Sequence, residues 1–236
     1  IQMSYYFIFV ILFFVGAYFE DAYKKKELPH FFKASGVLAL AAVVGVCINI
    51  SNLYHTYEYS KETMRGKSEL KQEGAAASQT SSGLDRDYIT NWSYGIGETL
   101  TLLVPNVKGG GSGSTMSQSE AAMAKANPMY NGIYSQLPQY FGEQPWTAGP
   151  VYVGAFVMFL FVLGCFIVKG PLKWALLGAT IFSILLSWGK NFMGLTDFFI
   201  DYVPMYNKFR AVSSILVIAE FTIPLLAIFA LKEILS

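Results

Sequence analysis

Residues 34–53 read ASGVLALAAVVGVCINISNL and contain no charged side chain. A helix needs about 20 mostly apolar residues to cross a bilayer, so this stretch predicts a transmembrane helix. A weaker run, Phe192–Val203, is interrupted by two aspartates and is expected to be interfacial or re-entrant. We therefore predict an all-α polytopic transmembrane helix bundle with a long, partly helical outer-face loop. The other predicted spans are Ile1–Phe19, Thr147–Val168, Trp174–Gly189, which is short for a full crossing, and Ala211–Leu231.

Composition supports the membrane class. Hydrophobic residues make up 53% of the chain and charged residues only 14%, against about a quarter in soluble domains. The net charge of +1 argues against a nucleic-acid partner held by bulk electrostatics. Cys47 and Cys165 lie in apolar runs and are expected to be small buried hydrophobes. The chain starts at Ile1 without a basic segment, so we expect an internal piece of a longer membrane protein.

Lysines set the expected orientation, because short loops rich in Lys and Arg stay cytoplasmic. They cluster after the first span, between the third and fourth spans, and after the fifth: Lys24, Lys25, Lys26, Lys33, Lys169, Lys173 and Lys232. Alternation of the spans puts all three clusters on one side. Three regions follow: two spans with a cytoplasmic loop (1–53), an extracytoplasmic region (54–146), and three spans with an outer connection at 190–210 (147–236).

The expected extracytoplasmic region divides into several successive segments. Residues 55–73 carry Glu and Lys or Arg at helical spacing and are expected to extend the second span as a solvated helix. Small polar residues at 74–83 and the GGGSGS core at 109–114 predict linkers without regular structure. These linkers separate two parts that are expected to be compact, Leu84–Lys108 and 129–152.

Three carboxylates of this region are candidates for catalysis, namely Asp85, Asp87 and Glu98. Near Trp92 and Tyr94 they could bind a sugar, because aromatic rings offer a flat face to a pyranose and carboxylates pair with its hydroxyls. One of them could be the general base for an acceptor hydroxyl. The alternatives are a solvated turn for the two aspartates and a helix cap for Glu98, and the residues alone leave both open.

Charged residues near the last span suggest further functions. Lys208 and Arg210 could meet a lipid phosphate, which Arg holds with a bidentate fork, or they could be interfacial anchors. Glu220 lies inside the span, where an ionisable residue is costly, and should face the bundle interior or a wet cavity. A structural hydrogen bond is the alternative for Glu220. Lys190 could be its partner or a further phosphate contact.

No metal or cofactor site is predicted. His55 and Glu58 would share a helix face, but a zinc site usually takes at least three protein ligands, and no other His or Cys completes one. A divalent metal is compatible with the sequence, but nothing in the sequence supports one.

Three segments resemble the YfhO family of bacterial membrane proteins, in forms found in Bacteroidetes. The segment WSYGIGETLTLLVPNVKGG (92–110) resembles an outer-loop pattern of that family, and LPQYFGEQPWTAGPVYVGAFVMFLF (137–161) is similar to its run into the next span. PMYNKFRAVSSILVI (204–218) resembles a Phe-Arg motif at the outer end of a later span. The pattern does not single out Asp85 or Asp87. By position it includes Tyr94, Glu98, Pro105, Asn106, Gly109, Phe209 and Arg210.

The resemblance implies a C-class glycosyltransferase of the bacterial inner (cytoplasmic) membrane. Such enzymes move a sugar from a polyprenyl-phosphate carrier to an acceptor on the outer face, here a cell-envelope glycan, lipid or protein. Their catalytic carboxylate usually lies in the first outer loop, which would precede Ile1. The roles implied for this chain are a hydroxyl-orienting group for Glu98, ring faces for Tyr94 and Trp92, carrier-phosphate contacts for Arg210 and Lys208, and substrate binding for Asn106.

Two other functional classes stay open. A non-enzymatic flippase or transporter of a lipid-linked precursor would also place Glu220 in the bundle, and inverted repeats would favour it; none is evident in the sequence. A structural membrane subunit would use the outer region to dock a partner.

Overall fold

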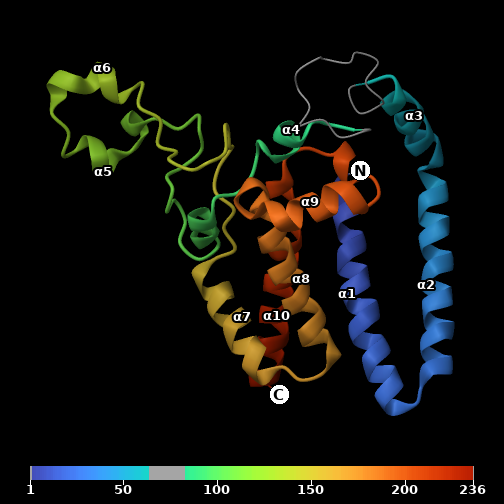
Figure 1. Cartoon of the computed structure of the whole chain (residues 1–236). Helices are drawn as coiled ribbons and strands as arrows, with labels where there is room; N and C mark the ends of the chain where they lie inside the picture. The colour runs from blue at the N-terminus through green and yellow to red at the C-terminus, as the bar shows by residue number, and fades with distance from the viewer. Residues whose placement is uncertain (1, 64–82, 236) are drawn as a thin grey trace.

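The computed structural model describes residues 2–63 and 83–235, and over these ranges it consists of helices and loops without a strand (Figure 1). Three helical segments are long and apolar enough to cross a membrane: α1 (Gln2–Lys25), α2 (Leu28–Ile48) and Val212–Leu235. The predicted all-α class of a transmembrane helix bundle is confirmed.

Helices α1, α7, α8 and α10 form the packed bundle. Helix α10 lies against both α7 and α8, and α1 lies against α8 on the other side (Figure 1). Burial is deepest in the segment Val212–Leu235, which contains α10. Half of its most apolar stretch of 18 residues is buried inside the structure. The bounds of the last three helices are Ala155–Ile167 for α7, Pro171–Ser187 for α8 and Val217–Leu235 for α10.

Small and hydroxyl residues bring these helices together. Gly164 of α7 sits against Leu226 and Ala230 of α10 so closely that a Cβ there would lie 3.1 Å from the first and 3.2 Å from the second. The hydroxyls of Thr180 and Thr222, both buried, form a 2.7 Å hydrogen bond between α8 and α10. Close backbone approach and hydrogen bonds across helices are what associates helices in lipid.

Helix α2 stands beside α1 without entering the bundle (Figure 1), and none of its residues is buried. It ends at a break at Asn49, after which α3 (Ile50–Lys61) continues. The solvated helix expected over 55–73 is therefore seen as far as Lys61. The rest of it falls within residues 64–82, outside the described residues, as does all but the last residue of the linker expected at 74–83.

The chain turns sharply after α8. The short helix η4 (Gly189–Phe192) and α9 (Met193–Tyr202) leave the direction of α8 at 108°, and α9 lies across the end of the bundle (Figure 1). Gly189 has φ +46°, and a Cβ there would lie 2.1 Å from the Ser93 Oγ, so only glycine fits this turn. The course of α9 agrees with the interfacial or re-entrant segment expected for Phe192–Val203.

Helix α7 is shorter than the span expected over Thr147–Val168. It begins only at Ala155 and has 13 residues, or about 20 Å against the roughly 30 Å hydrocarbon core of a bilayer. Pro150 and Gly154, which has φ +101°, interrupt the apolar run. The preceding segment instead passes beside residues 96–102, where the Val151 carbonyl accepts a hydrogen bond from Thr101.

Short helices gather at one end of the bundle (Figure 1), and we call them the cap. The opposite end holds the α1–α2 connection, the α7–α8 connection and the C-terminal end of α10, which are the three lysine-bearing segments, as the alternation of spans requires. The cap helices are α4 (Arg86–Thr90), η1 (Ile96–Leu102), η2 (Met116–Gln118), α5 (Glu120–Met123), η3 (Pro128–Tyr130), α6 (Asn131–Tyr134) and η5 (Tyr206–Lys208), and η6 (Val212–Leu216) leads from the cap into α10.

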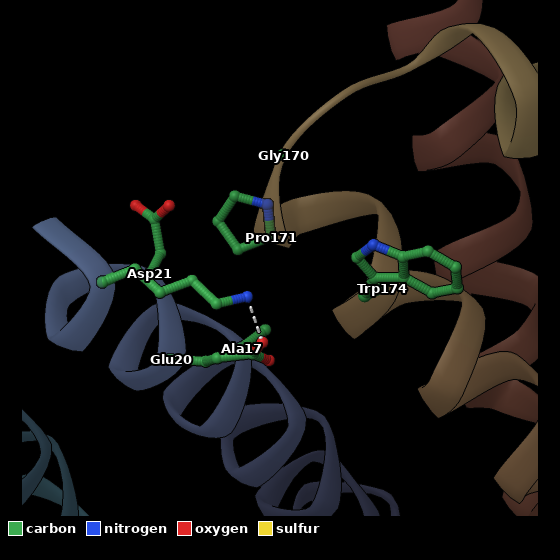
Figure 2. A pocket seen from close by; sticks show the side chains of 7 residues that line it. Ala17, Glu20, Asp21, Gly170, Pro171 and Trp174 are labelled. Carbon is green, nitrogen blue, oxygen red and sulfur yellow. Dashed lines mark hydrogen bonds and ion pairs between the residues drawn. The ribbon is translucent and has the colours of Figure 1, made fainter.

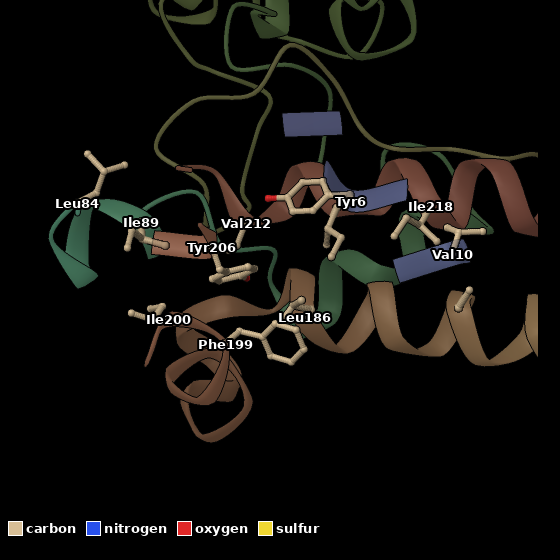
Figure 3. Close-up of a cluster of buried hydrophobic side chains, with 12 residues drawn as sticks. Tyr6, Val10, Leu84, Ile89, Leu186, Phe199, Ile200, Tyr206, Val212 and Ile218 are labelled. Carbon is tan, nitrogen blue, oxygen red and sulfur yellow. The ribbon is translucent and has the colours of Figure 1, made fainter. Parts of the chain in front are cut away.

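A buried apolar cluster joins the cap to the bundle (Figure 3). It combines side chains from α1, α4, α8, α9 and the segments that precede α10, so the cap rests on the helices below it. Residues of this cluster include Tyr6, Ile89, Leu186, Phe199, Tyr206 and Val212.

Candidate functional site

Glu98 lies inside the cap with 2% of its surface exposed. Its carboxylate accepts hydrogen bonds from the Gly95 amide (2.7 Å), the Tyr140 hydroxyl (2.6 Å) and the Glu143 amide (3.3 Å). Hydrogen bonds to a carboxylate are roughly twice as strong as neutral ones. The side chain therefore fastens η1 to residues 140–143, and this geometry favours the structural alternative over an open general base.

The Tyr140 hydroxyl completes this carboxylate clamp, by which we mean Glu98 with Tyr140. It donates to Glu98 and accepts from the Gln144 amide at 2.9 Å. Burial and the hydrogen bond to Glu98 raise the pKa of Tyr140. Gly142 permits the close approach, because a Cβ there would lie 2.0 Å from the Glu98 Oε1. The clamp thus fixes the course of the segment that leads to α7.

Tyr94 is buried, with 3% of its surface exposed. Its hydroxyl forms a 2.5 Å hydrogen bond with Thr101, and its amide donates to the Ser187 carbonyl at the end of α8. Burial raises the pKa of Tyr94. Its ring faces are covered, so in this arrangement Tyr94 anchors the cap on the bundle and offers no platform for a sugar.

Arg210 is exposed and lies over two aromatic rings. Its guanidinium carbon is 5.4 Å from the centroid of the Trp92 ring and 5.9 Å from that of Tyr88. Its Nη1 donates to the Tyr88 hydroxyl at 2.8 Å. Within the described residues it has no carboxylate partner. Cation–π contacts hold a guanidinium in place without neutralising it, so the site presents a positioned and uncompensated positive charge.

Backbone contacts determine where this cation lies. The Arg210 carbonyl accepts from the Gln2 side chain of α1 at 2.7 Å. The Trp92 carbonyl accepts from the Ser213 amide at 3.1 Å, and the Trp92 indole donates to the Trp146 carbonyl at 3.1 Å. Residues 140–146 therefore contact both the carboxylate clamp and the Trp92–Arg210 pair, and they connect the two parts of the candidate site.

The two aspartates of the candidate set lie apart from this cation. Asp85 caps α4 by accepting from the Asp87 amide at 3.1 Å, and both aspartates are exposed. Between them, Arg86 pairs with Asp197 and, at 2.6 Å, with Asp201. The geometry agrees with the solvated turn, and the Asp-Arg-Asp stretch ties α4 to α9.

Glu143 is a site residue that sequence reasoning missed. Its carboxylate accepts from the Asn191 side chain at 2.8 Å and lies 4.0 Å from the Lys190 Nζ, and the Glu143 side chain is 46% exposed. Lys190 thus faces Glu143 and not Glu220. The available signal was the segment 137–161, which carries this glutamate beside aromatic residues.

The remaining candidates are dispersed. Asn106 is an exposed turn residue with φ +60°, and its carbonyl accepts from the Gly109 amide. Lys208 is half-buried, and burial lowers its pKa.

Of the two environments expected for Glu220, the structure corrects the bundle interior, and the wet cavity stays a prediction. Its side chain is exposed, so it does not face the bundle interior. The buried positions of α10 nearby are Ala219, Thr222 and Ile223. Because a helix turns by about 100° per residue, Glu220 points away from the face that these residues share.

A hollow lies at the opposite end of the bundle from the cap, between the end of α1 and the start of α8 (Figure 2). It has a volume of about 430 Å³ and includes Glu20, Lys24 and Trp174 in its lining. Lys24 and Glu20 form an ion pair within one helix, so this hollow shows no uncompensated charge comparable to Arg210. No group of three or more His, Cys, Asp or Glu residues in the described parts of the chain is placed to hold a metal ion.

The site on the cap therefore consists of an exposed guanidinium on aromatic rings, a half-exposed carboxylate with an amide and an amine beside it, and a buried clamp that holds residues 140–146, which carry the carboxylate. Comparison of the chain with protein-family models, with curated proteins and with solved structures finds no match.

Proposed function

We propose that the chain is part of an integral-membrane glycosyltransferase that moves a sugar from a polyprenyl-phosphate carrier to a cell-envelope acceptor at the outer face. The observation that carries the proposal is Arg210, an exposed guanidinium held over Trp92 and Tyr88 at the end of a bundle of apolar helices. A phosphate at the membrane surface is the ligand such a fork binds bidentately. The resemblance to the YfhO family supports the same donor.

The chemistry of the step explains why a fixed cation is useful. An acceptor hydroxyl attacks the anomeric carbon, the bond from that carbon to the phosphate oxygen breaks, and the electron pair leaves on the lipid phosphate. Negative charge thus grows on the phosphate, where a prepositioned donor acts most strongly. Arg210 would supply this donor, and the two rings keep it oriented.

The acceptor proton needs a base. Glu98 accepts three hydrogen bonds and is buried, whereas Glu143 has a half-exposed carboxylate beside Asn191 and Lys190. In the proposed enzyme Glu98 therefore positions residues 140–146. Glu143 binds the acceptor hydroxyl and is positioned to accept its proton.

The test is sugar transfer by the full-length protein in lipid nanodiscs, using a panel of polyprenyl-phosphate hexoses. We expect Arg210→Ala to lower kcat by about 10²-fold or more, as loss of one charge-stabilising donor does, and Arg210→Lys to restore part of it. Lys125→Ala, which removes an exposed cation from the cap, is the matched control. Equal turnover in Arg210→Ala would remove this residue from the site. No turnover with any donor, together with movement of the lipid-linked sugar between leaflets, would instead establish the flippase.

One observation favours a second candidate, a structural subunit. The part of the cap around η3 and α6 carries exposed apolar side chains, including Met129 at 82% and Ile133 at 54% exposure, and in Figure 1 it projects beside the bundle. Exposed apolar patches of this kind mark interaction sites. Co-purification of one stoichiometric partner, lost in Met129→Ser with Ile133→Ser, would support this candidate.

A further inference from the structure

Glu220 lies on an exposed face of α10 and has no hydrogen bond or ion pair among the described residues. It follows Ser214, whose hydroxyl accepts from Gln2 at the start of α1. The rise of the helix places Glu220 about 10 Å from that level toward the opposite end of the bundle, and Lys232 lies about 18 Å further on. An ionisable side chain at this depth of a membrane helix is costly unless it is paired.

Pro224 leaves a second acceptor beside the carboxylate. In a regular helix the N–H of residue 224 donates to the carbonyl four residues earlier, which is that of Glu220, but proline has no N–H. Glu220 thus presents a carboxylate together with a carbonyl that lacks its usual helical donor. Two acceptors at one position are complementary to a group that carries positive charge and donates hydrogen bonds.

The exposed face of α10 has the spacing of a contact between helices. Its side chains are apolar, are exposed or half-buried, and follow one another at alternating steps of four and three residues: Val217, Phe221, Pro224, Ile228 and Leu231. Two helices pack along such a repeat at about +20°. Glu220 flanks the repeat, at a position where paired helices place charged side chains that face the partner. We call these five residues with Glu220 the α10 seam.

The carboxylate indicates what covers the α10 seam. Lipid tails cover apolar side chains, but they offer Glu220 no donor. A helix with a basic side chain covers the apolar repeat and pairs the carboxylate at the same time. A second copy of this chain does not bring that cation, because its apolar segments contain no Lys, Arg or His. These segments are 2–23, 34–53, 155–168, 174–189 and 211–231.

We propose that the α10 seam binds a membrane helix of a partner protein, and that this helix carries Lys or Arg at the depth of Glu220. The apolar side chains of the partner pack along the repeat. Its ammonium or guanidinium group donates to the carboxylate and to the carbonyl of Glu220. This interface lies on the side of α10 that the bundle leaves uncovered, and it does not depend on sugar transfer at Arg210.

The experiment measures the binding of synthetic membrane helices to the full-length protein in phosphatidylcholine vesicles, by energy transfer between a dye on the peptide and a dye on the protein. One peptide is a leucine-based helix with a single lysine about 10 Å from its cap-side end, and the matched peptide has leucine in place of that lysine. We expect the lysine peptide to bind about tenfold more tightly. Glu220→Gln should remove most of this difference.

A double variant controls for the position of the carboxylate. Glu220→Leu with Ile228→Glu moves it about 12 Å along α10, to a site where the wild-type side chain is 62% exposed. The tightest binding should then shift to a peptide whose lysine lies about 12 Å deeper. Thermal unfolding of each variant without peptide verifies that it is folded.

Other results overturn the inference. Equal binding of the lysine and leucine peptides to the wild type, or an unchanged difference in Glu220→Gln, would show that the carboxylate does not recognise a basic helix. Rapid reaction of Glu220→Cys with a membrane-impermeant maleimide would assign this face to a water-filled cavity. Disulfide-linked dimers of Ile228→Cys, formed without peptide, would assign the face to a second copy of the chain.

Discussion

Helices α2 and α10 have nearly the same apolar character and opposite environments. The most apolar windows of α2 and of the segment that contains α10 have mean hydropathies of 2.2 and 2.3, yet none of the first and 50% of the second is buried. In lipid, apolar side chains gain little by leaving one apolar environment for another, so close packing and hydrogen bonds decide which helices associate. Apolarity therefore predicts that a helix enters the membrane, and not whether it joins the bundle.

The strongest test of this contrast is the same substitution in the two environments. Gly164→Leu places a side chain where a Cβ already lies 3.1 Å from Leu226, and overpacking of this kind costs about 1–3 kcal/mol, occasionally more. Gly45→Leu meets no atom within 4 Å and should stay within about 0.5 kcal/mol of the wild type. The measurement is the free energy of unfolding in mixed micelles. Equal losses in both variants would contradict the contrast.

A second test asks whether the cap belongs to the packed part of the molecule. Glu98→Gln keeps the shape but replaces the carboxylate that receives the Gly95 amide and the Tyr140 hydroxyl. We expect a loss of about 1–3 kcal/mol for these buried hydrogen bonds, seen as faster amide hydrogen exchange at residues 140–146. Glu143→Gln, at a half-exposed position, is the control and should leave exchange nearly unchanged. If the amides of residues 140–146 exchange as slowly in Glu98→Gln as in the wild type, the clamp does not hold these residues in place.

A smaller effect is expected from the hydroxyl pair between α8 and α10. Thr180→Val removes the 2.7 Å hydrogen bond to Thr222. Such bonds in membrane proteins average about 0.6 kcal/mol and reach about 1.7. A double-mutant cycle with Thr222→Val isolates the coupling between the two residues. A coupling of zero would mean that packing alone associates these helices.

The last prediction concerns the pH dependence of stability, which we expect from a tyrosine of the cap. The pKa of Tyr140 is raised in the folded protein from an ordinary value of about 10, so the folded state keeps a proton that the unfolded state releases. Its stabilising contribution is complete below the unfolded pKa and is lost as pH rises through the folded pKa. The midpoint temperature of thermal unfolding, measured from about pH 8 to about pH 11, should therefore fall more steeply with rising pH in the wild type than in Tyr140→Phe. Parallel profiles would show that Tyr140 does not contribute.

Sequence reasoning reached the helical class and most helix positions, because apolar runs, lysines and glycines act locally. The late start of α7 had a local cause in Pro150 and Gly154 that the hydropathy of the run concealed. The bond from the Gly95 amide to Glu98 agrees with the helix cap that the sequence left open, but the bond from Tyr140, 42 residues further along the chain, had no local signal. The bundle interior, one of the two environments expected for Glu220, was wrong because a single sequence does not show which face of α10 meets its neighbours.

By itself, then, the sequence determined that this chain forms apolar helices suited to a membrane, with lysines at one end and a polar, aromatic region at the other. These are properties of single segments, and the transfer of a helix into lipid depends on its own side chains. The tertiary structure alone decided that α10 is buried and α2 is not. It also decided that Arg210 meets Tyr88 across 122 residues, because such contacts arise only when distant segments pack against one another.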